Sequence, residues 1–374
     1  MRQSNLPPAK SDSIVNAMET KMRTYPAIVR SMPGLALAAG LALIPQAVTA
    51  AGAGKPPAGK SPYQNVLVAE GASQKLCEAA PSRIFIRHDD DTACLAYFAT
   101  SGHETKRRAV VFFDGDAKPE QYADTAGRER RLKNIERNLQ SLATRLKVRI
   151  VRIARLGLDG SSGNHADRRR PKEIHIMNAT VDALKARLGF DDIVLAGQSR
   201  GSLIAASLIT LGRKDVACAV LGSGVFEHAN FIHQAVLKGN PHAKVKPGTF
   251  ARHVYDPSIA IGAIAVDSKR RIFIMGDPQD AQVPFDQQQR FAHGIGKAGH
   301  HVRLFEIDAY DEKQHGAVKY VMPAAAHCAN GAVDKQIESI VSRVRQNLAK
   351  GAAERAAKAA KTKAADAVED ATLH

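Results

Sequence analysis

Short runs of apolar residues alternate along this chain with longer segments in which apolar residues recur every three or four positions. The runs are typical of strands buried on both faces of a sheet, and the longer period is typical of helices. The predicted buried strands are 109–113, 148–153, 193–196, 218–221, 272–275 and 302–307. The predicted helices are 128–145, 174–188, 202–209, 285–295 and 333–348. This alternation predicts an α/β fold with a mostly parallel, doubly wound sheet covered by helices on both faces.

Two regions of the chain depart from that alternation. The apolar stretches 83–87 and 94–98 flank three consecutive aspartates, which predicts an antiparallel hairpin at one edge of the sheet. Residues 222–268 contain Gly, Pro and scattered helical pieces, and we expect a small cap or substrate loop there.

The first 50 residues have the composition of a secretory signal peptide. Basic residues precede the apolar run 33–44, and small residues follow at 47–52, with a plausible cleavage after Ala50. The apolar run is short, rich in Ala and Gly, and ends at Pro45, which favours cleavage over a membrane anchor. We therefore expect a periplasmic or secreted protein without stable membrane insertion.

The composition also suggests boundaries along the chain. The expected order is a signal peptide (1–50), a linker (51–75), one main domain (76–348) and an Ala/Lys-rich tail (349–374). The tail is expected to be a frayed helix or a disordered segment, and no function is assigned to it. Met18 and Met22 are alternative starts, and the sequence leaves this choice open.

The charge balance is strongly basic, with 53 Lys and Arg against 37 Asp and Glu and a net charge of +16. Such a balance is typical of proteins that bind nucleic acid or an anionic surface. No zinc-finger spacing or aromatic–basic motif accompanies it, and aromatic residues make up only 5%. We therefore expect a solvated basic surface rather than nucleic-acid binding.

The four cysteines fit an oxidising compartment. Cys77 and Cys94 flank a β-rich segment and are placed to join a hairpin. Cys218 lies in a predicted core strand, where a buried free thiol is an equal alternative, and Cys328 has no assigned partner. None has a C-x-x-C or metal-ligand spacing, so we expect no metal and no cofactor.

The stretch Gly197-Gln198-Ser199-Arg200-Gly201 carries the strongest chemical signal. It joins a predicted strand to a predicted helix with a serine at the apex. A G-x-S-x-G turn lifts the hydroxyl clear of the sheet and points the next N–H toward an oxyanion. The alternative is an ordinary strand–helix turn, since such turns favour glycine.

A nucleophilic serine needs a base and a group that orients the base. In an open α/β sheet these groups lie beyond the carboxyl ends of strands. Asp280 follows the strand 272–275, with Asp277 as its rival, which is equally suited to shaping the turn. His315 follows the last strand, whereas His300 and His301 precede it.

An oxyanion hole needs two N–H donors. The predicted donors are the backbone groups of Arg200 and Asp116, in a loop that has Asp114-Gly115 where a His-Gly pair is usual. A loop with the sequence Gly160-Ser161-Ser162-Gly163 follows another strand at the same edge. Arg155 and Ser161 are the weaker predicted substrate contacts there; the alternatives are a brace for the site and a flexible loop without a role.

On these motifs, residues from about 80 to 345 resemble the α/β-hydrolase superfamily, in which the order serine, acid, histidine matches Ser199, Asp280 and His315. The Arg155 to Gly163 loop and the Asp280-Ala281-Gln282-Val283-Pro284 segment look most like the prolyl oligopeptidase-like and dienelactone-hydrolase-like branches. The resemblance implies a serine hydrolase acting on a small ester or peptide. The alternative is a non-catalytic binding protein of the cell envelope. The oligomeric state stays open.

Overall fold

The computed structural model describes residues 73–116, 125–163, 170–228, 230–231 and 254–372. The predicted signal peptide, its cleavage after Ala50 and the linker up to residue 72 lie outside these residues. So do residues 229 and 232–253 of the predicted cap between 222 and 268. Within the described part of the chain, no helix is long and apolar enough to cross a membrane.

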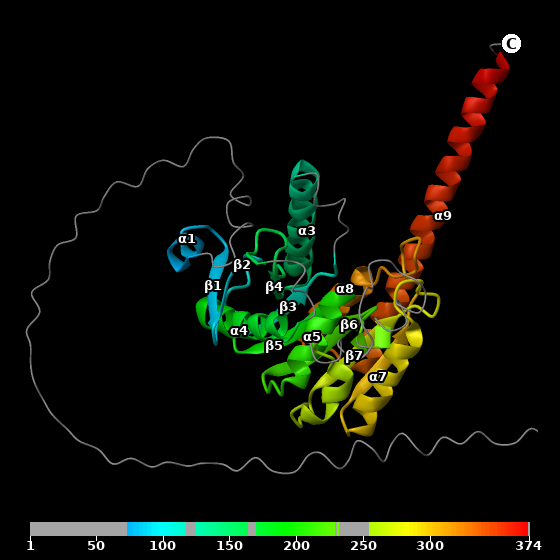
Figure 1. Cartoon of the computed structure of the whole chain (residues 1–374). Helices are drawn as coiled ribbons and strands as arrows, with labels where there is room; N and C mark the ends of the chain where they lie inside the picture. Colours follow the sequence, from blue (N-terminus) through cyan, green and yellow to red (C-terminus); the bar gives the residue numbers. More distant parts are fainter. Residues whose placement is uncertain (1–72, 117–124, 164–169, 229, 232–253, 373–374) are drawn as a thin grey trace, which may run out of the picture. The chain divides into compact units, whose positions relative to one another are not determined.

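Eight strands form a single sheet in the order β1-β2-β4-β3-β5-β6-β7-β8 (Figure 1). The strands are β1 (Arg83–His88), β2 (Asp91–Ala99), β3 (Arg108–Phe113), β4 (Arg149–Ile153), β5 (Asp192–Gln198), β6 (Val216–Gly222), β7 (Arg271–Gly276) and β8 (Val302–Glu306). β1 and β2 form an antiparallel hairpin, and β2 is antiparallel to β4. All other neighbouring pairs are parallel. The predicted mostly parallel sheet with an edge hairpin is confirmed.

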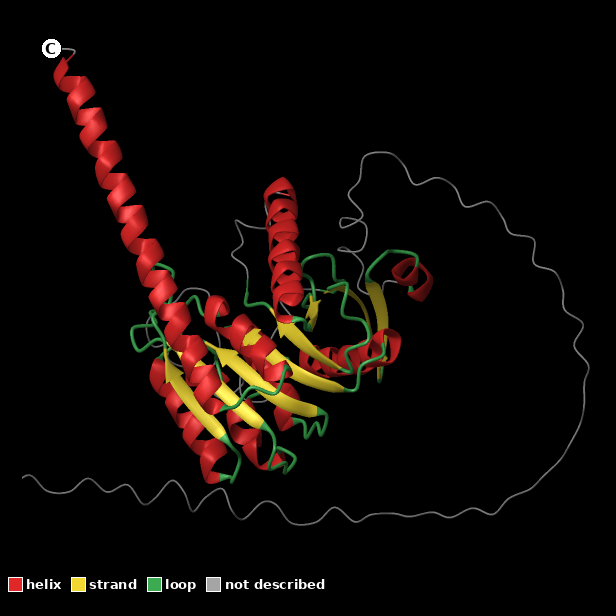
Figure 2. Ribbon diagram, turned by 180° about the vertical axis from the view of Figure 1, so that it is seen from behind, coloured by secondary structure: helices red, strands yellow, loops and turns green. Residues whose placement is uncertain are grey.

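Helices lie on both faces of this sheet, as the view in Figure 2 shows. The described helices are α1 (Gln74–Glu78), α3 (Thr125–Leu146), α4 (Pro171–Leu188), α5 (Arg200–Thr210), the 3₁₀ helix η5 (Pro257–Ala263), α7 (Phe285–Lys297), α8 (Val318–Ala329) and α9 (Asp334–Thr372). The predicted helices correspond to α3, α4, α5, α7 and the first part of α9.

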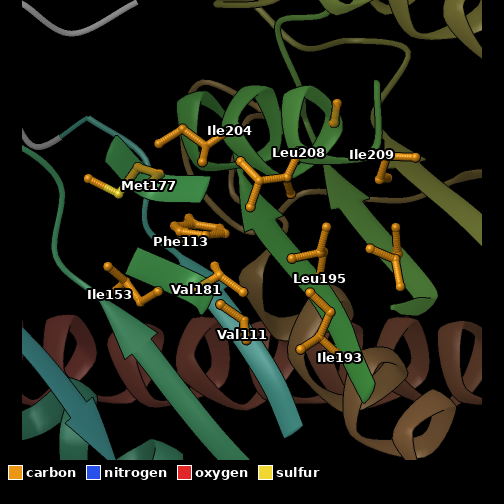
Figure 3. Packing of buried hydrophobic residues seen from close by; sticks show 14 of the residues in the cluster. Val111, Phe113, Ile153, Met177, Val181, Ile193, Leu195, Ile204, Leu208 and Ile209 are labelled. Atoms are coloured by element: carbon orange, nitrogen blue, oxygen red, sulfur yellow. The ribbon is translucent and has the colours of Figure 1, made fainter. Parts of the chain in front are cut away.

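The strands divide their side chains between two apolar clusters, because successive residues of a strand point to opposite faces. In β3, Val111 and Phe113 face a first cluster shared with α4, α5 and α7, part of which Figure 3 shows. Val110 and Phe112 face a second cluster shared with α3, α8 and α9. The interior positions of β3, β5 and β6 are therefore apolar on both faces.

Helix α8 was missed by the sequence analysis. It contains Pro323, a residue that usually interrupts a helix, and it has few polar residues, so the sequence pattern did not mark it as a helix. Helix α9 continues past Leu348, where the predicted closing helix ended, to Thr372. Ile337, Ile340 and Val341 of its first turns pack into the second cluster.

Two disulfides connect these elements. Cys77 of α1 pairs with Cys94 of β2, and Cys218 of β6 pairs with Cys328 of α8. The alternative of a free thiol at Cys218 was therefore wrong. A core-strand cysteine finds its partner in a helix 110 residues further along the chain, which no local pattern could indicate.

The two disulfides should differ in their contribution to stability, since a cross-link that closes a longer loop removes more entropy from the unfolded chain. Replacing Cys218 and Cys328 by Ala should lower the free energy of unfolding by about 5 kcal/mol, and replacing Cys77 and Cys94 by about 3 kcal/mol. Urea unfolding of the two double variants measures both values. A larger loss for the Cys77/Cys94 variant would contradict this ranking.

Candidate active site

Ser199 stands at the sharp turn between β5 and α5. Its backbone has φ 55° and ψ −115°, a strained conformation for a residue with a side chain. The turn is possible only because glycines flank it. A Cβ atom on Gly197 would lie 2.4 Å from the Gly201 carbonyl, and one on Gly201 would lie 2.0 Å from the Phe113 oxygen. The strained serine therefore sits against the end of β3.

His315 lies on the loop after β8, and its Nδ1 is 2.7 Å from Oδ2 of Asp280, on the loop after β7. The Asp280 side chain is fully buried. Its other oxygen accepts the N–H groups of Gln282 and Val283 at 2.8 and 2.9 Å. A carboxylate at Nδ1 favours the tautomer that leaves Nε2 free to act as a base.

The rival carboxylate, Asp277, has a different role in the structure. Its Oδ1 accepts the N–H of Gln279 at 2.8 Å, and its Oδ2 accepts the N–H of Ala309 at 2.7 Å. These bonds shape the turn after β7 and tie it to the loop after β8. Asp280, and not Asp277, is the carboxylate that contacts His315.

A cleft of about 550 Å³ lies over these loops. Its lining comes from the ends of β3 and β5, from α3, and from the loops after β6, β7 and β8. The lining residues are Asp114, Gly115, Asp116, Arg131, Gln198, Ser199, Arg200, Val225, Phe231, Gln282, Val283, Asp311, His315 and Val318. The structure thus brings Ser199, His315, Arg200 and Asp116 to one cleft, with Asp280 buried behind His315.

The loop after β3 passes directly beside Ser199. A Cβ atom on Gly115 would lie 3.2 Å from Cβ of Ser199. The carboxylates on either side of this glycine are held by buried arginines: Asp114 pairs with Arg152, and Asp116 contacts Arg155 at 2.5 Å. The negative charges of the two aspartates in this loop are therefore balanced by the charges of buried arginines.

Comparison with known proteins gives only distant similarity. No protein-family model matches the sequence, and no curated protein matches it. Est1E from Butyrivibrio proteoclasticus is 15% identical, with a TM-score of 0.47 over 67% of this chain and 98% of that one. The Pyrococcus furiosus esterase Pf2001 is 17% identical, with a TM-score of 0.42 over 61% and 80%. An acylaminoacyl peptidase from Pyrococcus horikoshii is 15% identical, with a TM-score of 0.42 over 67% and 40%.

The fold rests on the strand order and on the serine turn between β5 and α5. It is the α/β-hydrolase fold. In this fold the carboxyl edge of the sheet carries the ligand site, and the cleft of this chain lies at that edge. Among the residues that the structure describes, no group of three or more His, Cys, Asp and Glu side chains is placed to hold a metal ion.

Arg155 is a brace within this α/β-hydrolase fold rather than a lining residue of the cleft. Its side chain is 1% exposed and contacts both oxygens of the fully buried Glu173, at 2.9 and 3.1 Å, as well as Asp116. Burial by itself would lower the pKa of Arg155, but the charges of Glu173 and Asp116 raise it above its ordinary value. Arg155 therefore stays charged and joins the loop after β3 to α4.

Ser161 also differs from the predicted substrate contact. It is fully buried, and its hydroxyl accepts the N–H of Ala96 and donates to the Ala154 carbonyl, each at 3.0 Å. Both bonding directions of the hydroxyl are occupied by backbone groups. The predictions for Arg155 and Ser161 are corrected accordingly: the Gly160–Gly163 loop is fastened to β2, and these two side chains hold the scaffold behind the cleft.

The arginine after the serine was predicted only for its backbone N–H. Its guanidinium is nearly buried, contacts the ring of His228 and lies 5.1 Å from the ring centre of Phe231. The sequence pattern did not indicate His228 and Phe231, because both lie within the irregular segment after β6. The side chain of Arg200 thus forms part of one wall of the cleft.

Replacing Arg155 by Met should destabilise the fold strongly, since it removes the buried guanidinium that pairs with the fully buried carboxylate of Glu173. We expect a loss of about 3–5 kcal/mol in the free energy of unfolding, measured with urea. Arg290 is a matched control because it bridges Glu227 and Asp286 in the same way but is 49% exposed. Arg290→Met should cost about 1 kcal/mol or less, and equal losses would contradict the role of burial.

Proposed function

We propose that this protein is a serine hydrolase that cleaves an ester or amide bond of a small substrate through an acyl-enzyme. One observation carries the proposal: a strained serine lines the same cleft as a histidine whose Nδ1 contacts a buried carboxylate. Ser199, Asp280 and His315 come from three separate loops at the carboxyl edge of the sheet. The geometry supports the roles of nucleophile, orienting acid and base.

In the first half of the proposed reaction, Ser199 Oγ attacks the carbonyl carbon of the substrate. Nε2 of His315 takes the hydroxyl proton as the new C–O bond forms. The resulting imidazolium is stabilised by the Asp280 carboxylate, which needs no movement because backbone N–H groups already hold it.

The negative charge that develops on the carbonyl oxygen would be held by two backbone N–H groups. Arg200 provides the first as the first residue of α5, where the free N–H groups and the helix dipole favour an anion. Asp116 provides the second, from the loop that passes beside Ser199. Collapse of the tetrahedral intermediate then returns the proton from His315 to the leaving group, and water cleaves the acyl-enzyme by the same steps.

The proposed substrate is a small ester or a short peptide. The cleft volume of about 550 Å³ is in the range of sites that enclose a small molecule. We also propose export to the periplasm or to the medium. The two disulfides support this location, and the signal-like first 50 residues are compatible with it.

Replacing Ser199 by Ala should remove the nucleophile without removing the fold. We expect kcat for p-nitrophenyl acetate to fall by about 10⁶-fold or to background, and labelling by a fluorophosphonate probe to disappear. Ser207, buried in the same helix with its hydroxyl on the Leu203 carbonyl, gives the control Ser207→Ala, which should label normally. Full labelling of the Ser199 variant would rule out the proposed nucleophile. A wild-type chain without turnover would favour a non-catalytic binding protein.

Substitutions of the two aspartates after β7 should lower kcat to different extents in the p-nitrophenyl acetate assay. Asp280→Asn removes the charge that holds the His315 tautomer and stabilises the imidazolium, so kcat should fall by about 10⁴-fold. Asp277→Asn keeps an oxygen for the turn and should lower kcat by less than about tenfold. A greater loss of kcat in the Asp277 variant would assign the role of orienting acid to Asp277 and not to Asp280.

A further inference from the structure

Gln198, the residue before the proposed nucleophile, joins the serine turn to the histidine loop. It is the last residue of β5 and is 8% exposed. Its Nε2 donates to the backbone carbonyl of His315 at 2.8 Å, and its Oε1 accepts the N–H of Ala317 at 2.9 Å. One side-chain amide therefore holds the backbone of His315 itself and of Ala317, two residues further along.

The histidine loop needs such a partner for local reasons. Gln314 has φ 54°, and the helix α8 begins at Val318, with Ala317 as an N-cap that has no side-chain oxygen. The N–H groups at a helix start are unsatisfied unless an acceptor is supplied. Gln198 supplies that acceptor from a strand 119 residues away.

The surrounding packing leaves little room for another arrangement. A Cβ atom on Gly222 would lie 2.8 Å from Cβ of Ala317, so the start of α8 packs directly on the end of β6. The Ser199 N–H donates to the carbonyl of that same Gly222 at 2.8 Å. The serine turn and the start of α8 thus both contact Gly222. The Gln198 amide links the serine turn to the histidine loop a second time, through its two hydrogen bonds.

We propose that Gln198 is a positioning residue that sets the placement of His315 relative to Ser199. The inference rests on the proposed function, and it adds a residue that takes no proton and touches no reacting atom. The Oε1 contact caps α8, whereas the Nε2 contact holds the carbonyl of His315 itself. We therefore expect the Oε1 bond to affect mainly the stability of the fold and the Nε2 bond to affect mainly kcat.

Two variants separate these halves at pH 8, where a glutamate is ionised. Gln198→Met keeps the volume but removes both bonds. Gln198→Glu keeps an acceptor for the Ala317 N–H, and adds a negative charge at a helix start, but has no donor for the His315 carbonyl. The measurements are the Tm, and kcat and KM for p-nitrophenyl acetate.

Gln198→Met should lower both the Tm and kcat, with kcat falling by about 10- to 100-fold and KM changing by less than about threefold. Gln198→Glu should recover much of the Tm while kcat stays low. Gln140 is the matched control, because its amide holds the N–H and carbonyl of Ser101 at 2.9 and 3.2 Å and does not line the cleft. Gln140→Met should lower the Tm and leave kcat unchanged.

The outcomes distinguish failure of the positioning role of Gln198 from failure of the proposed hydrolase function. An active wild type with equally active Gln198 variants, or a kcat that simply follows the Tm across all variants, would overturn the positioning role and leave the proposed function standing. Loss of the folded state in both Gln198 variants would assign this residue to folding instead. A wild type that neither hydrolyses the ester nor reacts with the fluorophosphonate probe would overturn both proposals.

Discussion

The close approach of α5 to the end of β3 is the constraint on which the arrangement of the cleft depends. Gly201 lies so near the Phe113 carbonyl that no side chain fits between them, and Gly197 meets Gly201 in the same way across the turn. This packing forces Ser199 into its strained backbone conformation and brings the loop after β3 against it. The proposed nucleophile and the proposed oxyanion donors are therefore placed by a single contact between two backbones.

Buried ion pairs hold the loop after β3 that lies beside this contact. Arg152 and Arg155 each hold one aspartate of the loop after β3 and one further acid, Asp159 or Glu173. Such bridges contribute little net stability compared with apolar packing, but removing one partner is costly because a charge remains buried. Their value here lies in geometry: they fix the side chains of Asp114 and Asp116 in the loop that passes beside Ser199.

The histidine side of the cleft is held by hydrogen bonds to backbone groups and to the His315 ring, and not by arginine ion pairs. Asp280, Asp277 and Gln198 each connect a backbone segment or ring to another loop at the same edge. The loops after β7 and β8 are thereby joined to each other and to the serine turn. In this arrangement the proposed base has little freedom of its own, as expected for a reaction that depends on alignment.

The sequence by itself determined the periodic features of this protein. Continuous apolar runs located the buried strands, since a strand covered on both faces is apolar at every position. The glycine spacing around Ser199 located the turn, and the position of Asp280 and His315 after strands indicated the edge where they lie; their roles remain proposals. Each of these patterns can be recognised from residues that lie only a few positions apart in the sequence.

Only the tertiary structure decided which distant groups meet. Helix α8 contains a proline and few polar residues, so its sequence did not indicate a helix, and nothing near Cys218 indicated its bond to Cys328. Arg155 and Ser161 looked like groups available to a substrate, yet both are buried in bonds to other elements. Strand order brings residues tens to more than a hundred positions apart into contact, and burial then decides whether a polar side chain faces the cleft or braces the scaffold.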